Sequence, residues 1–121
     1  MAALTLTTFG GVNGVATATV NTASASDTMT YTANAGQMLE MDNTTGGSLT
    51  LNIVGTGVSA AYPISGLPTT VDLTAGYSVV VAAGVKKVLN LDKIKPYLLS
   101  SGTSGTITLS GAATLKITVY A

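Results

Sequence analysis

Few residues of this sequence can do chemistry, and one pair of carboxylates has a spacing that would suit it. Glu40 and Asp42 are two residues apart, so on a β-strand their side chains point to the same face. Together with Asn43 they offer oxygen ligands for a hard cation such as calcium, or an acid and a base for hydrolysis. No loop of the EF-hand type accompanies them in the sequence, so we favour the alternative of two solvated carboxylates beside a turn.

The composition excludes most other reactive sites. The 121 residues include no His and no Cys, which removes the usual zinc, haem and iron–sulfur ligands, the imidazole-activated nucleophiles and any disulfide framework. Charged residues make up 8% of the chain, the basic ones are all Lys, and the formal net charge is +0. With a single Phe, the sequence lacks the basic stripe and stacking platform of a nucleic-acid-binding protein. We therefore predict a non-enzymatic protein with no cofactor, no metal and no nucleic-acid partner.

Two short motifs have a chemical interpretation that their context does not support. Residues 55–60 (GTGVSA) match part of the glycine-rich dinucleotide-binding fingerprint, but no helix is predicted after them. Asn43-Thr44-Thr45 matches a glycosylation acceptor, and without a secretory signal we interpret it as a turn.

The elements that must position these residues are predicted to be strands. Polar and apolar residues alternate, as in strands with one buried face, in segments 4–7, 28–33, 48–53 and 114–119. Less regular segments of the same kind are 15–20, 37–41, 71–73, 78–83, 85–91 and 106–110. Gly, Asn and Pro separate them, and helix is predicted only as about one turn within residues 90–99, next to Pro96. We predict an all-β fold of about 8–10 short strands, an antiparallel β-sandwich or jelly-roll-like structure, with a small barrel as the alternative.

The ends of the predicted domain follow from the same patterns. Residues 1–14 are predicted to form an N-terminal arm, and residues 15–121 a single β-sandwich domain. The first residues contain no basic segment followed by an apolar one, so we expect no signal peptide, and no apolar run is long enough for a membrane span.

Charge is unevenly distributed along the chain. Residues 1–85 carry four acidic residues and no Lys, whereas residues 86–121 carry five Lys and one Asp. One interpretation is that Lys86, Lys87, Lys93 and Lys95 dock onto an acidic partner or onto the acidic half of a neighbouring copy. The alternative, which we weigh equally, is that they protect an exposed edge strand from further pairing.

Aromatic and apolar residues complete the predicted interface. Tyr62 and Tyr97 each lie beside a Pro in predicted loops, where Tyr can anchor a partner or stack on a sugar. Leu4, Leu6 and Phe9 lie in the predicted arm, and Phe9, followed by two glycines, would anchor its end; burial of Phe9 in the protein's own core is the alternative.

The sequence as a whole resembles the small β-sandwich decoration, or cement, proteins of tailed-bacteriophage capsids. The similarity is one of pattern, and it covers the Thr/Ala/Gly-rich beginning MAALTLTTFGGVNGVATATV, then AGQMLEMDNTTGGSLTLNIVG, VDLTAGYSVVVAAG and the closing SGTITLSGAATLKITVYA. The resemblance implies a virion protein on the outer capsid surface that bridges major capsid proteins, as a homo-oligomer with a trimer favoured. A phage fibre or spike head and a carbohydrate-binding β-sandwich are the alternatives.

A surface this poor in charge is also consistent with assembly. Little like-charge repulsion separates the copies, and apolar residues in excess of one small core would be covered by other chains.

Overall fold

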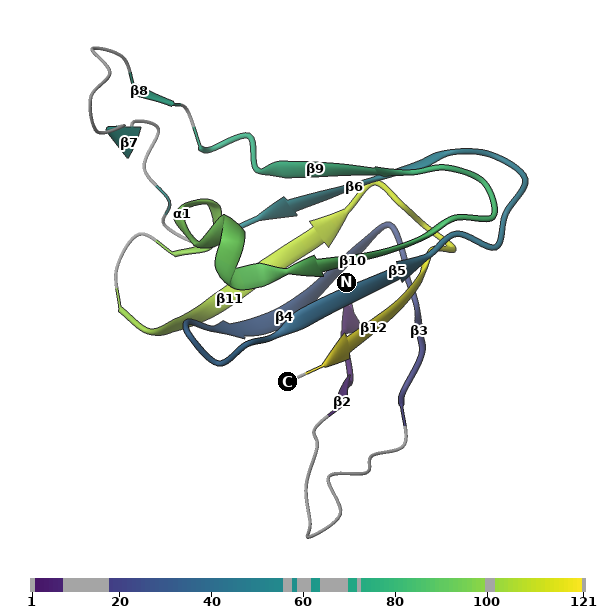
Figure 1. Ribbon diagram of the computed structural model, residues 1–121, viewed down its shortest axis with the longest axis horizontal. Helices are drawn as coiled ribbons and strands as arrows, with labels where there is room; N and C mark the ends of the chain where they lie inside the picture. The colour runs from purple at the N-terminus through teal and green to yellow at the C-terminus, as the bar shows by residue number, and fades with distance from the viewer. Residues whose placement is uncertain are drawn as a thin grey trace, which may run out of the picture.

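Two β-sheets stacked face to face form the body of the protein, with the edge strands β9 and β10 on the same side (Figure 1). The computed structural model describes residues 2–7, 18–55, 58, 62–63, 70–71, 73–99 and 102–120. The predicted all-β, sandwich-like fold is confirmed.

The first sheet, which we call sheet A, has the strand order β1-β4-β11-β6-β9. Its neighbours are antiparallel, except for the short strand β1, which runs parallel to β4. The strands are β1 (Ala2–Ala3), β4 (Ser26–Thr32), β6 (Leu49–Val54), β9 (Tyr77–Val81) and β11 (Ser104–Ser110).

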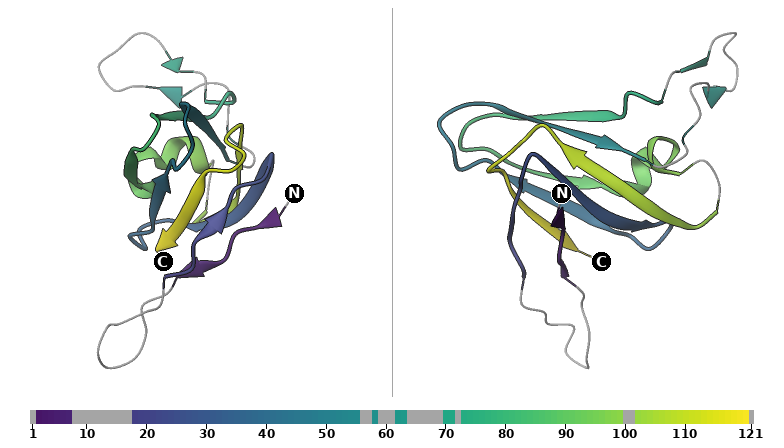
Figure 2. Two further views of the ribbon diagram at one scale, coloured as in Figure 1. Left: turned by 90° about the vertical axis from the view of Figure 1, so that its right-hand side faces the viewer. Right: turned by 180° about the vertical axis from the view of Figure 1, so that it is seen from behind.

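The second sheet, sheet B, has the order β10-β5-β12-β2, and β3 pairs with a further part of β12. The strands are β2 (Leu6–Thr7), β3 (Asn21–Thr22), β5 (Met38–Asp42), β10 (Lys86–Asn90) and β12 (Lys116–Tyr120). Sheets A and B are linked at one end by the β9–β10 connection and at the other by the helical segment after β10 (Figure 2).

The remaining elements are short. The helical segment consists of a 3-10 helix, η1 (Leu91–Ile94), and one α-helical turn, α1 (Lys95–Leu98), with Pro96 in the first turn of α1. The helical turn predicted within residues 90–99 is therefore confirmed. A two-stranded sheet of β7 (Tyr62–Pro63) and β8 (Thr70–Val71) lies apart from both main sheets. Among the described residues, no helix has the length and hydropathy needed to cross a membrane.

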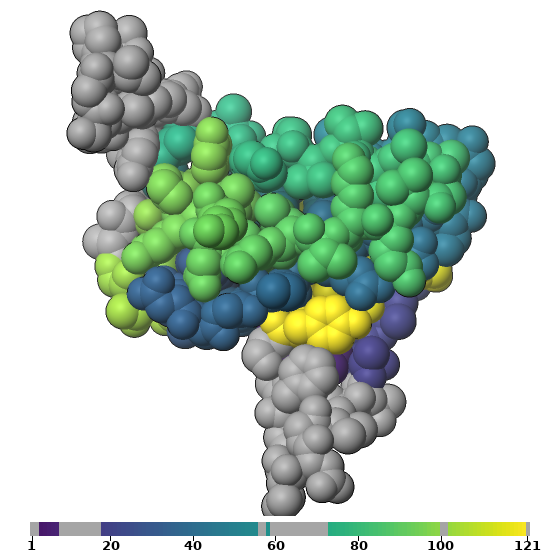
Figure 3. All heavy atoms as spheres, viewed as in Figure 1, coloured from purple at the N-terminus to yellow at the C-terminus, as the bar shows by residue number. Residues whose placement is uncertain are grey.

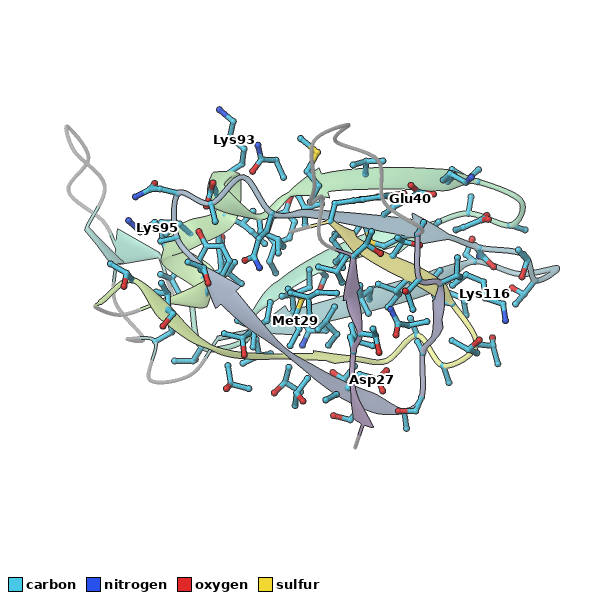
Figure 4. The ribbon with its side chains drawn as sticks, turned by 90° about the horizontal axis from the view of Figure 1, so that it is seen from below. Asp27, Met29, Glu40, Lys93, Lys95 and Lys116 are labelled. Carbon is cyan, nitrogen blue, oxygen red and sulfur yellow. The ribbon has the colours of Figure 1, made fainter. Side chains whose placement is uncertain are left out.

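The core lies between the two sheets and is built from the apolar residues of the alternating segments. Met29, which lies between the sheets in Figure 4, is 3% exposed, and Tyr31 is fully buried. The other large buried side chains follow the predicted alternation; they are Leu39, Met41, Leu51, Ile53, Ile107, Leu109, Leu115, Ile117 and Val119. Leu91 and Leu98 from the helical segment close one end of this core.

The beginning of the chain differs from the predicted arm. Residues 2–3 pair with β4 and residues 6–7 pair with β12, so residues 2–7 are strands of the two sheets. Residues 8–14 of the predicted arm lie outside the described residues. A strand predicted at 15–20 is not seen in residues 18–20, and pairing with β12 begins at Asn21. The Asn21 side chain bonds to the backbone of both Thr5 and Ile117, and so joins the two short strands that border β12.

Candidate interaction surfaces

The predicted carboxylate pair lies on the outer face of sheet B. Glu40 and Asp42 share that face, as predicted; Asp42 is in register with two lysines, whereas Glu40 is in register with Val88 and Thr118 and with no third acidic group. Asp42 lies between Lys86 of β10 and Lys116 of β12. The Lys86 ammonium is 3.5 Å from Glu40 Oε1, and the Tyr120 hydroxyl donates to Glu40 Oε2 at 3.0 Å. This hydrogen bond raises the pKa of the Tyr120 hydroxyl.

Asn43 is not available as a cation ligand because its side chain is buried and fully bonded. Its amide nitrogen donates to the carbonyls of Gly47 at 2.7 Å and Val81 at 2.8 Å. Its Oδ1 accepts from the backbone N–H of Thr45 at 3.0 Å and from the hydroxyl of Thr45 at 2.6 Å. The motif Asn43-Thr44-Thr45 therefore forms a turn, as predicted, and 0% exposure of Asn43 is incompatible with a glycan on its amide. Within the described residues, no three Asp or Glu side chains gather as metal ligands, and no pocket is present.

Two other carboxylates accept hydrogen bonds from neighbouring parts of the chain. Asp27 is 1% exposed and accepts from the backbone N–H and the hydroxyl of Ser24. Asp92, at the start of η1, accepts from the Tyr31 hydroxyl at 2.6 Å and from the backbone N–H groups of Asn34 and Gly36. The Tyr31 hydrogen bond holds the pKa of Asp92 below its usual value, while burial and the neighbouring carboxylate raise the pKa of Tyr31.

The four predicted interface lysines do not form one surface. Lys86 pairs with Glu40, and the Lys87 ammonium donates to the Val80 carbonyl at 2.7 Å. Lys93 is exposed and Lys95 half-buried; both lie at the helical end of the sandwich, whereas Lys116 lies towards the other end (Figure 4). The uneven distribution of charge along the sequence is thus largely compensated within sheet B, where β5 lies between β10 and β12.

The predicted aromatic and apolar contacts are also dispersed. Leu4 is 7% exposed and belongs to the core, so its side chain is not a surface contact. Leu6 and Tyr97 are half-buried against the same core, and Tyr97 packs edge to face on Tyr77 with ring centroids 5.4 Å apart. Tyr62 begins β7, and Phe9 lies outside the described residues.

Sequence reasoning missed the outer face of sheet A, which carries hydroxyl groups in register. Four residue pairs between β4 and β11 each set one Ser or Thr against another; they are Ser26–Ser110, Thr28–Thr108, Thr30–Thr106 and Thr32–Ser104. The neighbouring outward positions on β6 and β9 are Thr50, Asn52, Val54, Ser78 and Val80. We call this set the hydroxyl face, and it contains no charged residue. The signal was present in the Thr alternation of SDTMTYT and SGTITLS, but its meaning depends on which strands are neighbours.

The site and the fold together define an all-β sandwich with a charged outer face on sheet B and an uncharged outer face on sheet A. In comparisons with protein-family models, curated proteins and solved structures, no match to the chain is found.

Proposed function

We propose that this chain is a non-enzymatic structural protein that binds the outer surface of an assembled phage head and bridges its major capsid proteins. The observation that carries the proposal is the hydroxyl face of sheet A, a surface of four strands without a charged side chain. Depletion of charge is the compositional signal of an interface core, and among the described strands the outer face of sheet A carries no charged side chain, whereas that of sheet B does. The pattern resemblance to capsid decoration proteins supplies the kind of partner.

Such a face binds without long-range attraction. Each Ser and Thr hydroxyl both donates and accepts, so the face can pair with backbone or side-chain groups of a partner of either polarity. A protein that binds the assembled lattice but not the free subunit stabilises the lattice by linkage, and simultaneous contacts with several subunits increase its occupancy. This mechanism needs no catalytic group and no cofactor.

The direct experiment is co-sedimentation of the purified chain with expanded heads of the tailed phage that encodes it. We expect the chain to pellet with expanded heads and to remain in the supernatant with dissociated capsid subunits. Absence from the pellet at saturating concentration, or a gene that lies outside any phage genome, would refute the proposal.

Substitutions then test the face itself. Thr30→Lys and Ser104→Lys place a charge on exposed positions of the hydroxyl face, and burial of an unpaired charge in a contact costs several kcal/mol. We expect at least about a tenfold loss of affinity for the heads. Thr44→Lys, on an exposed loop position away from this face, is the matched control and should bind like the wild type. Equal binding by all three variants would exclude the hydroxyl face as the contact.

The lysines of the helical end form a separate part of the proposal. Lys93 is exposed and Lys95 half-buried, and we propose that their charge attracts the chain to an acidic region of the head before the hydroxyl face binds. Lys93→Gln with Lys95→Gln should slow association in low salt. An unchanged association rate would remove the lysines from the proposal and leave the hydroxyl face untouched.

A further inference from the structure

The open edge of sheet B is strand β10, whose five residues pair on one side with β5. Among the described residues no strand pairs with its other side, and β10 lies uncovered at the surface of the space-filling view (Figure 3). Three of its residues, Lys86, Lys87 and Val88, are exposed, and Val88 is 59% exposed.

The ladder with β5 determines which backbone groups of β10 face outward. Asn43 N–H donates to the Val85 carbonyl and Leu91 N–H donates to the Gln37 carbonyl, both in the register of the β10–β5 pair. In an antiparallel ladder, bonded and non-bonded residue pairs alternate. The odd-numbered residues from 85 to 91 therefore point their N–H and C=O groups towards β5, and Lys86, Val88 and Asn90 point theirs away from it.

We infer that β10 is a self-pairing edge, at which a second copy of this chain adds its own β10 antiparallel across a two-fold axis at Val88. In this register Val88 lies opposite Val88 of the second copy, and Lys86 lies opposite Asn90. All three outward residues of each copy then form bonded pairs, on the order of six hydrogen bonds in total. A register displaced by two residues leaves one or more of these groups without a partner, so the axis at Val88 is the one that satisfies the whole edge.

The side chains favour the same register. Val88 would meet its own copy on the outer face of sheet B, where Cβ atoms of opposed residues are about 5 Å apart, and this contact covers the exposed apolar side chain. Met38 of β5, which is 42% exposed, is in register with Asn90 of β10. Because Asn90 would lie opposite Lys86 of the second copy, Met38 would lie near the methylene groups of that lysine. Because the lysines stand at one end of β10, the antiparallel arrangement keeps them apart, whereas a parallel one would set Lys86 against Lys86.

The lysines themselves leave the edge open. Lysines protect edge strands by bringing like charges together when two edges meet. Here the Lys86 ammonium lies over sheet B beside Glu40, and the Lys87 ammonium bonds to the Val80 carbonyl of β9, so each charge has a partner within its own chain. The edge retains its hydrogen-bonding groups without a charge opposed to its own copy.

Light scattering coupled to size-exclusion chromatography of the purified chain, from about 1 to 100 μM, gives the first measurement. We expect the mass to rise with concentration towards twice that of one chain. A mass that stays at one chain over this range, or a mass of three chains, would overturn the inference.

A charge exchange at the axis tests the register. Val88→Lys and Val88→Glu each place two like charges opposite one another, and each should weaken the pair at least about tenfold. An equimolar mixture of the two variants should restore the double mass, because the mixed pair opposes Lys to Glu.

Val80→Lys, at a 53% exposed position on the other edge strand β9, is the matched control and should associate like the wild type. Failure of the mixture to restore association, or an equal loss in Val80→Lys, would contradict pairing at Val88. Far-ultraviolet circular dichroism of each variant verifies that the sheets are intact. These measurements use the chain alone, so their outcome is independent of binding to phage heads.

Discussion

Replacement of Asn43 by Ala tests whether one buried side-chain amide joins the β5–β6 connection to the end of β9. The Asn43 side chain bonds to Gly47 and Thr45 in its own loop and to the Val81 carbonyl at the end of β9. Its backbone also bonds to residues 84 and 85 of the β9–β10 connection. Ala preserves those backbone bonds and removes every side-chain bond, so the substitution isolates the amide.

The expected loss of stability follows from which of the bonded groups are buried. The bond to Val81 is buried, and a buried carbonyl without a partner costs about 1–3 kcal/mol. The bonds to Gly47 and Thr45 are partly exposed, so water replaces much of what they contribute, about 0.5–1.5 kcal/mol in all. We therefore expect Asn43→Ala to lower the free energy of unfolding by about 3 kcal/mol, a large share of the 5–15 kcal/mol typical of a domain.

Urea denaturation followed by circular dichroism measures this loss as a lower midpoint at an unchanged slope. Asn52→Ala is the matched control, since Asn52 is half-buried on the hydroxyl face and the hydrogen bond that it accepts from the Ser78 hydroxyl is exposed. It should cost less than about 0.5 kcal/mol. A loss below about 1 kcal/mol in Asn43→Ala, or a loss equal to that of the control, would refute the reasoning.

Replacement of Asn43 by Asp extends the test to pH. A carboxylate at this position faces two carbonyl oxygens and is buried, so the folded state raises the pKa of the introduced group. As the pH rises, the introduced carboxyl group therefore loses its proton at a lower pH in the unfolded state than in the folded state. The variant should accordingly lose stability as the pH rises above about 4. A stability that does not depend on pH in this range would show that the amide environment is more open than the structure indicates.

Three further perturbations have separate causes. Tyr31→Phe removes the 2.6 Å hydrogen bond to Asp92 and should lower the free energy of unfolding by about 1–2 kcal/mol in urea denaturation. Because the fold lowers the pKa of Asp92, the wild type should lose stability as the pH falls below about 4, and the variant should show a weaker pH dependence. Gly55→Ala sets a Cβ against the backbone of α1 and should lower the free energy of unfolding by about 3 kcal/mol, whereas Gly46→Ala, which meets no atom within 4 Å, should leave it nearly unchanged; equal thermal midpoints would contradict this. Lys86→Gln breaks an exposed ion pair of 3.5 Å and should change stability by less than about 0.5 kcal/mol, so a larger loss would show that the pair is worth more than its exposure allows.

The longer strands could be predicted because their signal is local. In β4 and β12 the apolar residues recur every second position, and the structure buries Met29, Tyr31, Ile117 and Val119 as this period requires. The helical turn after β10 was likewise indicated by Pro96, and in the structure Asn90 caps it by accepting from the N–H of Asp92. These features depend on a few consecutive residues and not on which strands are neighbours.

The pairing of distant segments could not be read from the sequence. Residues 2–7 form two short parallel pairs with β4 and β12, and parallel pairing leaves no turn signal that connects the partners. The prediction that the lysines form one docking segment was likewise made without knowing which strands are neighbours. Once β5 lies between β10 and β12, Asp42 is in register with Lys86 and Lys116, and a sequence separated into acidic and basic parts becomes a locally compensated sheet.

The two proposed surfaces are compatible in geometry. An axis through Val88 that relates antiparallel strands of one sheet runs perpendicular to that sheet, so both copies turn the same side of the sandwich in the same direction. The hydroxyl face belongs to the other sheet and is left uncovered by pairing at β10. A pair of chains would therefore present two hydroxyl faces to one flat lattice, and binding of the first would bring the second close to its site. On this reasoning Val88→Lys should weaken binding to phage heads while the isolated domain remains folded, and the mixture with Val88→Glu should restore it; unchanged binding by Val88→Lys alone would show that each chain binds the lattice singly.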